Sequence, residues 1–425
     1  MNQYYIEGGY PIGGTIRASG NKNAALPCIA AALLTEEPVI LRNIPNIEDV
    51  QVMLDVYRAF GGTTETLGPN AIRMRLGDIK TSEVPADAAR RIRASILFAG
   101  PLLARTGKAV LPPPGGDVIG RRRLDTHFLA LTELGAQVET NRDYCFTARS
   151  LHGADIFLDE ASVTATENAI MAAVLARGET LLTNAAGEPH VQDLCRMLIA
   201  MGAKIEGIGS NILRIWGVEK LSGCEYEIGA DFMEVGSFIG LAAATRGELR
   251  IQGILPRDIR PAKIAFGKLG IVWEHDGSTL YVPKDQSLTV NHDLGGMIPK
   301  IDDAPWPGFP PDLTSIITVV ATQVNGTILV HEKMFESRMF FVDKLIAMGA
   351  RIVLCDPHRA VISGPTKLMA SELISPDVRA GMAMVIAAMC AEGSSIIRNV
   401  YQIERGYENL VARLSSLGAR IRGEE

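Results

Sequence analysis

The sequence predicts an α/β fold of two inside-out, barrel-like lobes, each built from three repeats, with buried helices surrounded by sheets. Three observations lead to this class. Phrases such as LGAQVE, MGAKIE and MGARIV recur about every 70 residues. A run rich in β-forming residues precedes each copy, and a helical segment that is apolar on nearly every face precedes each run. Six copies fill the chain and divide naturally into two lobes of three.

Each repeat begins with the apolar helix, for which the pattern predicts burial on all sides. These segments are 23–34, 93–104, 165–176, 234–245, 313–324 and 379–391. A short strand follows each helix, within 38–43, 107–112, 178–184, 247–253, 326–332 and 393–399. An amphipathic outer helix comes next; Val50, Leu54 and Tyr57 share one face of the first. The recurring glycines, which end these helices before the last strands, are Gly61, Gly135, Gly202, Gly270, Gly349 and Gly418.

The composition is that of an ordinary soluble globular protein, because 47% of the 425 residues are hydrophobic and 21% are charged. A net charge of −6 argues against a nucleic-acid partner. We see no signal peptide and no apolar run long enough for a membrane span, so we expect a cytoplasmic protein. The unpaired spacing of the six cysteines predicts buried free thiols, and no histidine pattern indicates a metal site. The glycine-rich stretch 8–14 predicts a hairpin turn.

Charged residues stand at equivalent places in different repeats. Lys22, Arg93 and Arg379 each begin an apolar helix, where the helix dipole disfavours a cation, and Asp312 begins another. A second equivalent position, after the strand, holds Arg122, Arg338 and Arg405. Six cations so placed favour a phosphate or carboxylate ligand in a cleft between the lobes. The alternative is that they are ordinary solvated charges.

The loop PPPGGDVIGRRRLDTH, residues 112–127, places Asp117 between two glycines and an arginine run. Two interpretations remain open for this carboxylate. Asp117 either pairs with Arg121 or Arg123, or it donates a proton beside an anionic substrate.

Seven ordered motifs resemble the enolpyruvyl transferase family, and within it the branch that uses UDP-N-acetylglucosamine. They are SGNKNAALP, RASILFAGPLLAR, PGGDVIGRRRLDTH, PGFPPD, FESRM, DVRAGMA and IERGYE, and together they extend over essentially the whole chain. The resemblance implies one lobe at 22–229, which carries the catalytic loop (about 112–123), and a second lobe made of 1–21 and 230–425, with the active site in the cleft between them. It implies enolpyruvyl transfer from phosphoenolpyruvate to the sugar 3-hydroxyl, with release of phosphate and no cofactor, as the first committed step of peptidoglycan synthesis.

The family's site residues carry over to matching positions. The resemblance makes Asp312 the base that deprotonates the hydroxyl, and Asp117 the acid toward C3, at a position that is cysteine in most members. The cations of the phosphoenolpyruvate site would be Lys22, Arg93, Arg122, Arg338, Arg379 and Arg405. The remaining contacts to the acceptor would be Asn23, Asp125, His127, Ser162 and Val163. Because fosfomycin alkylates the family's cysteine, Asp117 predicts resistance.

Four positions depart from the family pattern: Arg123, Glu160, Thr164 and Phe232. They motivate an alternative, an enolpyruvyl transferase for a different nucleotide or nucleotide-sugar acceptor. Arg121 and Arg123 could instead compensate for cations missing elsewhere. A non-catalytic paralogue that binds nucleotide sugar is a third hypothesis, against which the presence of both an acid and a base argues. The sequence does not predict the oligomeric state.

Overall fold

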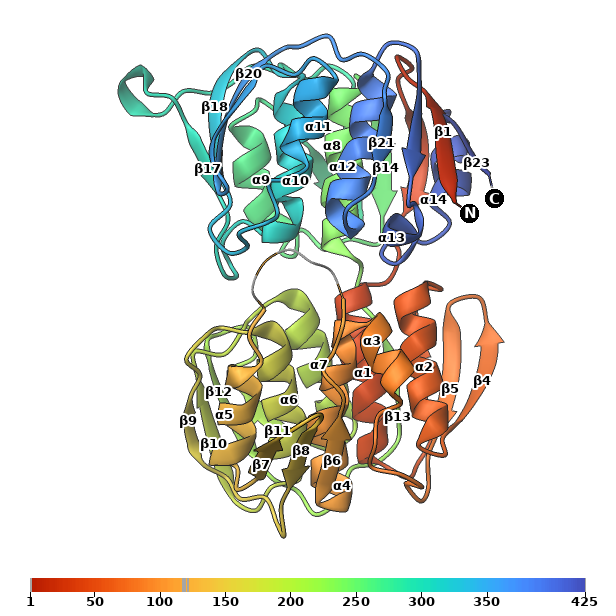
Figure 1. Ribbon diagram of the computed structural model, residues 1–425, viewed down its shortest axis with the longest axis vertical. Coiled ribbons are helices and arrows are strands. Elements are labelled where there is room, and N and C mark those ends of the chain that lie inside the picture. The colour runs from red at the N-terminus through yellow and green to blue at the C-terminus, as the bar shows by residue number, and fades with distance from the viewer. Residues whose placement is uncertain (1, 117–119, 121, 425) are drawn as a thin grey trace. The chain divides into compact units, whose positions relative to one another are not determined.

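A computed structural model of the chain describes residues 2–116, 120 and 122–424, and within them two compact units. One unit comprises residues 20–116 and 122–229. The other comprises residues 2–19 and 230–424, together with Gly120. Each unit has its own hydrophobic core. In each unit of Figure 1, helices occupy the interior and strands lie around them.

The predicted apolar helices form the centre of each unit. They are α1 (Lys22–Ala31), α4 (Ala99–Thr106) with the preceding 3-10 turn Arg93–Phe98, α6 (Val163–Ala173), α8 (Phe232–Ala244), α10 (Thr314–Ala321) and α12 (Val378–Cys390). Every residue of α8 is buried, and so is nearly every residue of α12. In the second unit α10 packs against both α8 and α12, which confirms the predicted burial on all sides.

Side chains that precede the buried helices satisfy the backbone N–H groups at several of their first turns. Asn21, Ser162, Asp231 and Asp377 cap α1, α6, α8 and α12. An uncapped N–H in the interior would lose hydrogen bonds to water without replacement, so these polar side chains are needed there.

Six small sheets surround the helices. In the first unit their strand orders are β13-β3-β5-β4, β6-β8-β7 and β11-β12-β10-β9; in the second they are β15-β16-β14-β2, β17-β18-β20-β19 and β21-β22-β1-β23. The first-unit strands are β3 (Val39–Arg42), β4 (Thr63–Gly68), β5 (Ala71–Arg75), β6 (Lys108–Leu111), β7 (Gln137–Thr140), β8 (Tyr144–Thr147), β9 (Asp155–Phe157), β10 (Glu179–Thr183), β11 (Lys204–Glu206), β12 (Ile212–Trp216) and β13 (Cys224–Glu227). The second-unit strands are β1 (Gln3–Glu7), β2 (Gly13–Arg17), β14 (Glu248–Gln252), β15 (Glu274–Asp276), β16 (Thr279–Val282), β17 (Lys300–Asp302), β18 (Gly326–His331), β19 (Ile352–Asp356), β20 (Arg359–Gly364), β21 (Glu372–Ile374), β22 (Ser394–Arg398) and β23 (Arg420–Glu424).

An outer helix follows the leading strand of each repeat. These helices are α2 (Glu48–Ala59), α5 (Asp125–Glu133), α7 (Pro189–Ala200), α9 (Arg260–Gly267), α11 (Val342–Ala347) and α14 (Leu410–Ser416). Two further short helices are α3 (Ala86–Arg91) and α13 (Tyr401–Glu404). All six recurring glycines adopt a positive φ, between 70° and 103°, so each reverses the chain in a conformation that few other residues accept.

Strand exchange closes each unit. Strand β13, at the end of the third repeat, pairs parallel with β3 of the first repeat. Strand β2, near the N-terminus, pairs parallel with β14 of the fourth, and β1 lies between β22 and β23 of the sixth. The N-terminal segment therefore completes the unit that contains the C-terminal half.

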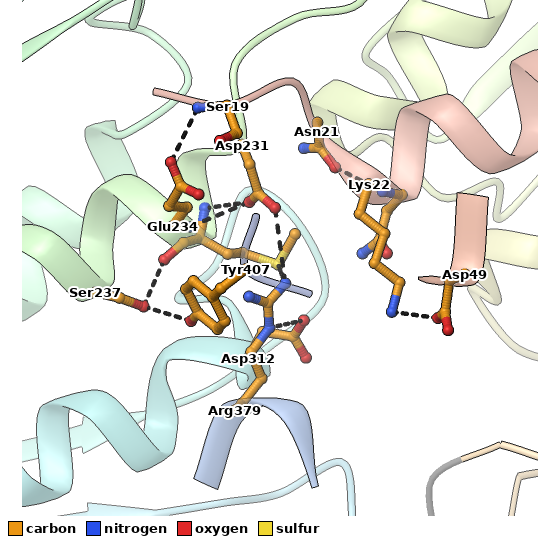
Figure 2. A network of polar contacts seen from close by, with 12 residues as sticks. Ser19, Asn21, Lys22, Asp49, Asp231, Glu234, Ser237, Asp312, Arg379 and Tyr407 are labelled. Carbon is orange, nitrogen blue, oxygen red and sulfur yellow. Dashed lines mark hydrogen bonds and ion pairs between the residues drawn. The ribbon is translucent and has the colours of Figure 1, made fainter. Parts of the chain in front are cut away.

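Glu234 anchors the segment that leaves β2. Its carboxylate accepts a hydrogen bond from the Ser19 backbone N–H and two from the Arg413 guanidinium. Arg413 also donates to the Ser19 hydroxyl and to the Arg17 carbonyl. These hydrogen bonds position the end of the segment just before Lys22, and Figure 2 shows the contact between Glu234 and Ser19.

Two sequence expectations were wrong. Stretch 8–14 is not a hairpin turn, because β1 and β2 on its two sides belong to different sheets. The cysteines are free, but Cys355 is exposed and only Cys28 and Cys195 are fully buried. Across the described ranges, no helix is long and apolar enough to cross a membrane.

Candidate active site

Lys22 and Asn23 open α1 in the first unit. Asn21 Oδ1 accepts a hydrogen bond from the Asn23 backbone N–H at 2.8 Å and caps the helix. Lys22 Nζ lies 2.6 Å from a carboxylate oxygen of Asp49, and both side chains are largely buried (Figure 2). Asp49 thus offsets the unfavourable interaction of the ammonium with the helix N-terminus.

Arg93, Arg122 and Asp125 line one pocket of about 310 Å³ in the same unit. Its other lining residues are Pro113, Pro114, Leu124, Phe128 and Tyr144. A lining that combines convergent charges with several apolar side chains suits a small polar ligand.

The pocket holds a partly desolvated cation. The Arg93 guanidinium donates to the backbone carbonyls of Arg122 and Arg123, at 2.6 and 3.1 Å. Burial, together with the neighbouring Arg122, lowers the pKa of Arg93 to about 10. Arg93 remains charged at neutral pH, so an anionic ligand would relieve this unfavourable environment.

Arg123 is directed toward carboxylates instead. Its Nε lies 3.1 Å from Asp125 and its Nη2 lies 3.0 Å from Asp159. Asp159 also accepts a hydrogen bond from the Thr126 hydroxyl. These contacts argue against the idea that Arg123 replaces a cation missing from the pocket.

His127 is locked as a neutral imidazole. Its Nδ1 lies 2.9 Å from the Asn168 amide nitrogen, which can only donate, so Nε2 carries the proton and donates to Thr164 Oγ1 at 3.0 Å. Burial lowers the pKa of His127 to about 3, and Arg93 adds to the effect. His127 therefore acts as a fixed, uncharged support for the start of α6.

Ser162 and Val163 stand at the start of α6, where Ser162 Oγ accepts a hydrogen bond from the Ala165 backbone N–H. Both residues are half-buried. They are brought near Arg93 and Asp125 only indirectly, through the link between His127 and Thr164.

Asp312, Arg338 and Arg379 meet in the second unit. The Asp312 carboxylate lies 2.9 Å from Arg338 Nη2 and 3.1 Å from Arg379 Nε. Both arginine side chains are almost fully buried, whereas 24% of the Asp312 side chain is exposed. The most solvent-accessible group of this cluster is therefore the Asp312 carboxylate, whereas the two arginine side chains that contact it are buried.

Arg379 has a second set of partners (Figure 2). Its Nη2 lies 3.9 Å from Asp231 and 3.6 Å from the Met233 sulfur, and its guanidinium lies over the Tyr407 ring at 5.3 Å. The Tyr407 hydroxyl in turn contacts Ser237 on α8, 2.8 Å away. Arg379 Nη1 is buried without a hydrogen-bond partner of regular geometry in the described part of the chain, although the guanidinium also interacts with the Tyr407 hydroxyl.

Arg405 follows α13 and is almost fully buried, and its Nη1 donates to Gln402. Asp117 and Arg121 lie outside the described residues. Asp49 and Asp231, which pair with Lys22 and Arg379, could not be predicted from the sequence, because each pairing depends on the completed fold.

Comparisons with known proteins agree on one family. A family model described as EPSP synthase (3-phosphoshikimate 1-carboxyvinyltransferase) matches residues 6–414. A Treponema denticola protein named UDP-N-acetylglucosamine 1-carboxyvinyltransferase is 72% identical, and the match covers 100% of both chains. Proteins of the same name from Treponema pallidum and Bradyrhizobium diazoefficiens are 67% and 57% identical; the matches cover 99% of this chain in each case, and 99% and 97% of those proteins. The chain belongs to the enolpyruvyl transferase family.

Solved enolpyruvyl transferases share the fold. NikO from Streptomyces tendae superimposes with a TM-score of 0.87 at 24% identity, covering 99% of this chain and 98% of that one. EPSP synthase from Acinetobacter baumannii gives 0.75 at 17% identity, over the full length of both. The predicted α/β architecture is thereby confirmed.

Two of the four departures from the family pattern have a structural explanation in this enolpyruvyl transferase. Thr164 accepts the His127 hydrogen bond, as described above. Phe232, the first residue of α8, is buried with its ring 5.7 Å from that of Trp306. Glu160 is exposed, and its carboxylate lies close enough to Arg93 for its charge to raise the pKa of that guanidinium.

Proposed function

We propose that the protein transfers the enolpyruvyl group of phosphoenolpyruvate to the 3-hydroxyl of UDP-N-acetylglucosamine and releases phosphate. One observation carries the reaction class: Asp312, a partly exposed carboxylate, is held by two buried arginines. A base next to concentrated positive charge suits an anionic donor and a hydroxyl acceptor. The acceptor follows from relatives of up to 72% identity that bear that enzyme's name.

The donor requires cations because phosphoenolpyruvate carries both a phosphate and a carboxylate. We assign Lys22, Arg93, Arg122, Arg338, Arg379 and Arg405 to these groups. In the structure, Lys22 is paired with Asp49, and Arg338 and Arg379 are paired with Asp312. The anions of the substrate compete for the same cations, so binding would weaken the hold on Asp312 and make it a better base.

The reaction proceeds by addition and elimination. Asp312 takes the proton of the 3-hydroxyl, whose oxygen attacks C2 of the donor while C3 gains a proton. The product of this step is a tetrahedral ketal. Loss of a proton from C3 then re-forms the double bond as phosphate departs, and the arginines stabilise its charge.

Asp117 is our proposed acid toward C3. A carboxyl that donates a proton near neutral pH needs an apolar setting, which the residues Pro112 to Gly116 favour, whereas nearby arginines oppose it. Asn23, Asp125, His127, Ser162 and Val163 complete the acceptor site in this proposal. His127 would act there as a neutral hydrogen-bonding support.

The wider role is part of the same proposal. The lobes 22–229 and 1–21 with 230–425 would both contribute residues to the reaction. The reaction would open peptidoglycan synthesis in the bacterial cytoplasm.

The test is phosphate release from phosphoenolpyruvate with single acceptors. UDP-N-acetylglucosamine should support release, whereas UDP-glucose and UDP alone should not. Release with another nucleotide but not with UDP-N-acetylglucosamine would favour the different-acceptor hypothesis. Binding of phosphoenolpyruvate without release in any mixture would favour a non-catalytic protein.

A further inference from the structure

Two acids meet behind Arg338 at the ends of two parallel strands. Strands β17 and β18 pair in parallel, and their last paired residues are Asp302 and His331. Asp303 and Glu332 follow directly, so the register places both at the same edge of the sheet. Backbone N–H groups hold one oxygen of each: Lys333 donates to Asp303 Oδ1, and Met334 and Phe335 donate to Glu332 Oε1.

The other oxygen of each acid lacks a donor. Asp303 and Glu332 are 1% and 0% exposed. Asp303 Oδ2 and Glu332 Oε2 are both buried without a hydrogen-bond partner of regular geometry in the described part of the chain, although the two carboxyls interact directly and the Thr314 hydroxyl also acts on Glu332. Two adjacent buried carboxylates repel each other when both are ionised, and neither can then donate to the other. A single proton between them would satisfy both oxygens.

The surrounding charges do not compensate for two ionised acids. The nearest cation is Arg338, whose Nε lies 3.8 Å from Glu332 Oε2 and which already pairs with Asp312. Asp377 and Arg379 also act on Arg338. The neighbouring basic groups are engaged elsewhere: Lys333 Nζ is bound to Asp302, and His358 Nδ1 faces the Glu332 backbone carbonyl. The His331 backbone carbonyl accepts a hydrogen bond from the Asp303 N–H. Thr314, on α10, faces Glu332.

We propose that Asp303 and Glu332 share one proton, and that this acid pair positions Arg338 toward Asp312. With one proton, the pair carries a single negative charge. This charge partly neutralises the Arg338 guanidinium at Nε, while Nη2 of the same guanidinium contacts Asp312. Without the proton, a second charge would draw the guanidinium away from Asp312 and the donor. Neither acid touches the substrate in this proposal, so both are positioning residues. The catalytic consequence rests on the proposed function, whereas the shared proton does not.

The first test observes the proton directly. Burial raises the pKa of Glu332 to about 8, and the neighbouring Asp303 adds to the rise, against the effect of Arg338. The infrared difference between the parent and Glu332→Gln at pH 7 should therefore show a protonated carboxyl band in the parent, which disappears above pH 8. The exposed pair of Glu372 with Arg398 provides the control, Glu372→Gln, which should leave that band unchanged. A parent without the band at pH 7 would overturn the proposal.

The second test uses stability. Glu332 keeps its proton when folded but loses it near pH 4.5 when unfolded, so the stability of the parent should fall as pH rises from about 4.5 to about 8. Glu332→Gln keeps the two backbone hydrogen bonds and can donate to Asp303, so it should escape this loss. The difference in Tm, variant minus parent, should grow across that window. A difference that is constant with pH would contradict the shared proton.

The third test addresses Arg338. Phosphate release by the parent should decline above pH 8, and the kcat ratio of Glu332→Gln to parent should rise by about threefold or more between pH 7 and 9.5. Parallel pH profiles would show that the pair has only a structural role and would contradict the positioning claim. A parent that releases no phosphate under any condition would instead contradict the proposed function, and the infrared test would still decide the acid pair.

Discussion

Asp312 is the residue on which the proposed chemistry depends most. Removing its basicity with Asp312→Asn should lower kcat by about 10²- to 10⁴-fold, the usual contribution of a general base. Phosphoenolpyruvate should still bind, because Arg338 and Arg379 remain, and calorimetry would measure that affinity. Asp356→Asn, which alters an exposed ion pair with Arg359, is the matched control and should leave kcat unchanged. A variant at Asp312 that retained parental kcat would remove the base from the mechanism.

Asp117 predicts the response to fosfomycin. A carboxylate is a far weaker nucleophile toward an epoxide than a thiolate, so we expect no time-dependent inactivation of the parent. Asp117→Cys should be inactivated progressively, with the added mass of one inhibitor molecule per chain. Equal inactivation rates for parent and variant would show that Asp117 does not occupy the reactive position.

His127 should not titrate near neutral pH. Because its pKa lies at about 3, the folded protein binds fewer protons than the unfolded chain between about pH 3 and the ordinary histidine value, and stability should rise with pH over that window. Its ring resonances, assigned by their loss in His127→Gln, should stay constant from pH 5 to 8 in an NMR titration. A titration midpoint near 6.5 would mean that the imidazole is solvated and that its hydrogen bond to Thr164 is absent.

At the scale of the element, the recurring glycines can be tested one at a time. Gly202 has φ +103°, and a Cβ there would meet no atom within 4 Å, so Gly202→Ala measures backbone strain alone. We expect a loss of about 1–2 kcal/mol in the free energy of unfolding. Gly267→Ala is the control, because Gly267 lies in α9 with equally open surroundings and without a positive φ. It should be neutral or stabilise by up to about 1 kcal/mol. If chemical denaturation showed equal changes in the free energy of unfolding for Gly202→Ala and Gly267→Ala, positive φ would not explain why glycine recurs at these positions.

The elements were the most predictable part of the molecule. Helices α8 and α12 are apolar on every face, and that pattern alone predicts their burial. The prediction of a hairpin turn at 8–14 was wrong because the local sequence does not show that β1 and β2 pair with strands hundreds of residues away. Pairing between distant strands depends on the whole fold, which a short segment does not encode.

At the scale of the whole molecule, the cations could be predicted from repeat position, but their partners could not. Arg379 belongs to the set of cations that begin buried helices and Arg338 to the set that follows the strands, and the fold brings both to Asp312. Asp49 and the pair of Asp303 with Glu332 carry no repeat signature, and Asp231 shares only its helix-capping position with other repeats, so the structure alone reveals their pairing. Pairing compensates buried charge, and burial is a property of the completed fold.

The most direct test of the central claim is the mass of the product formed from UDP-N-acetylglucosamine and phosphoenolpyruvate by the purified protein. Enolpyruvyl transfer predicts an acceptor heavier by one enolpyruvyl unit, formed in step with one phosphate per molecule, and formed about 10²- to 10⁴-fold more slowly by Asp312→Asn. An acceptor of unchanged mass, while phosphoenolpyruvate still binds, would contradict the proposed function.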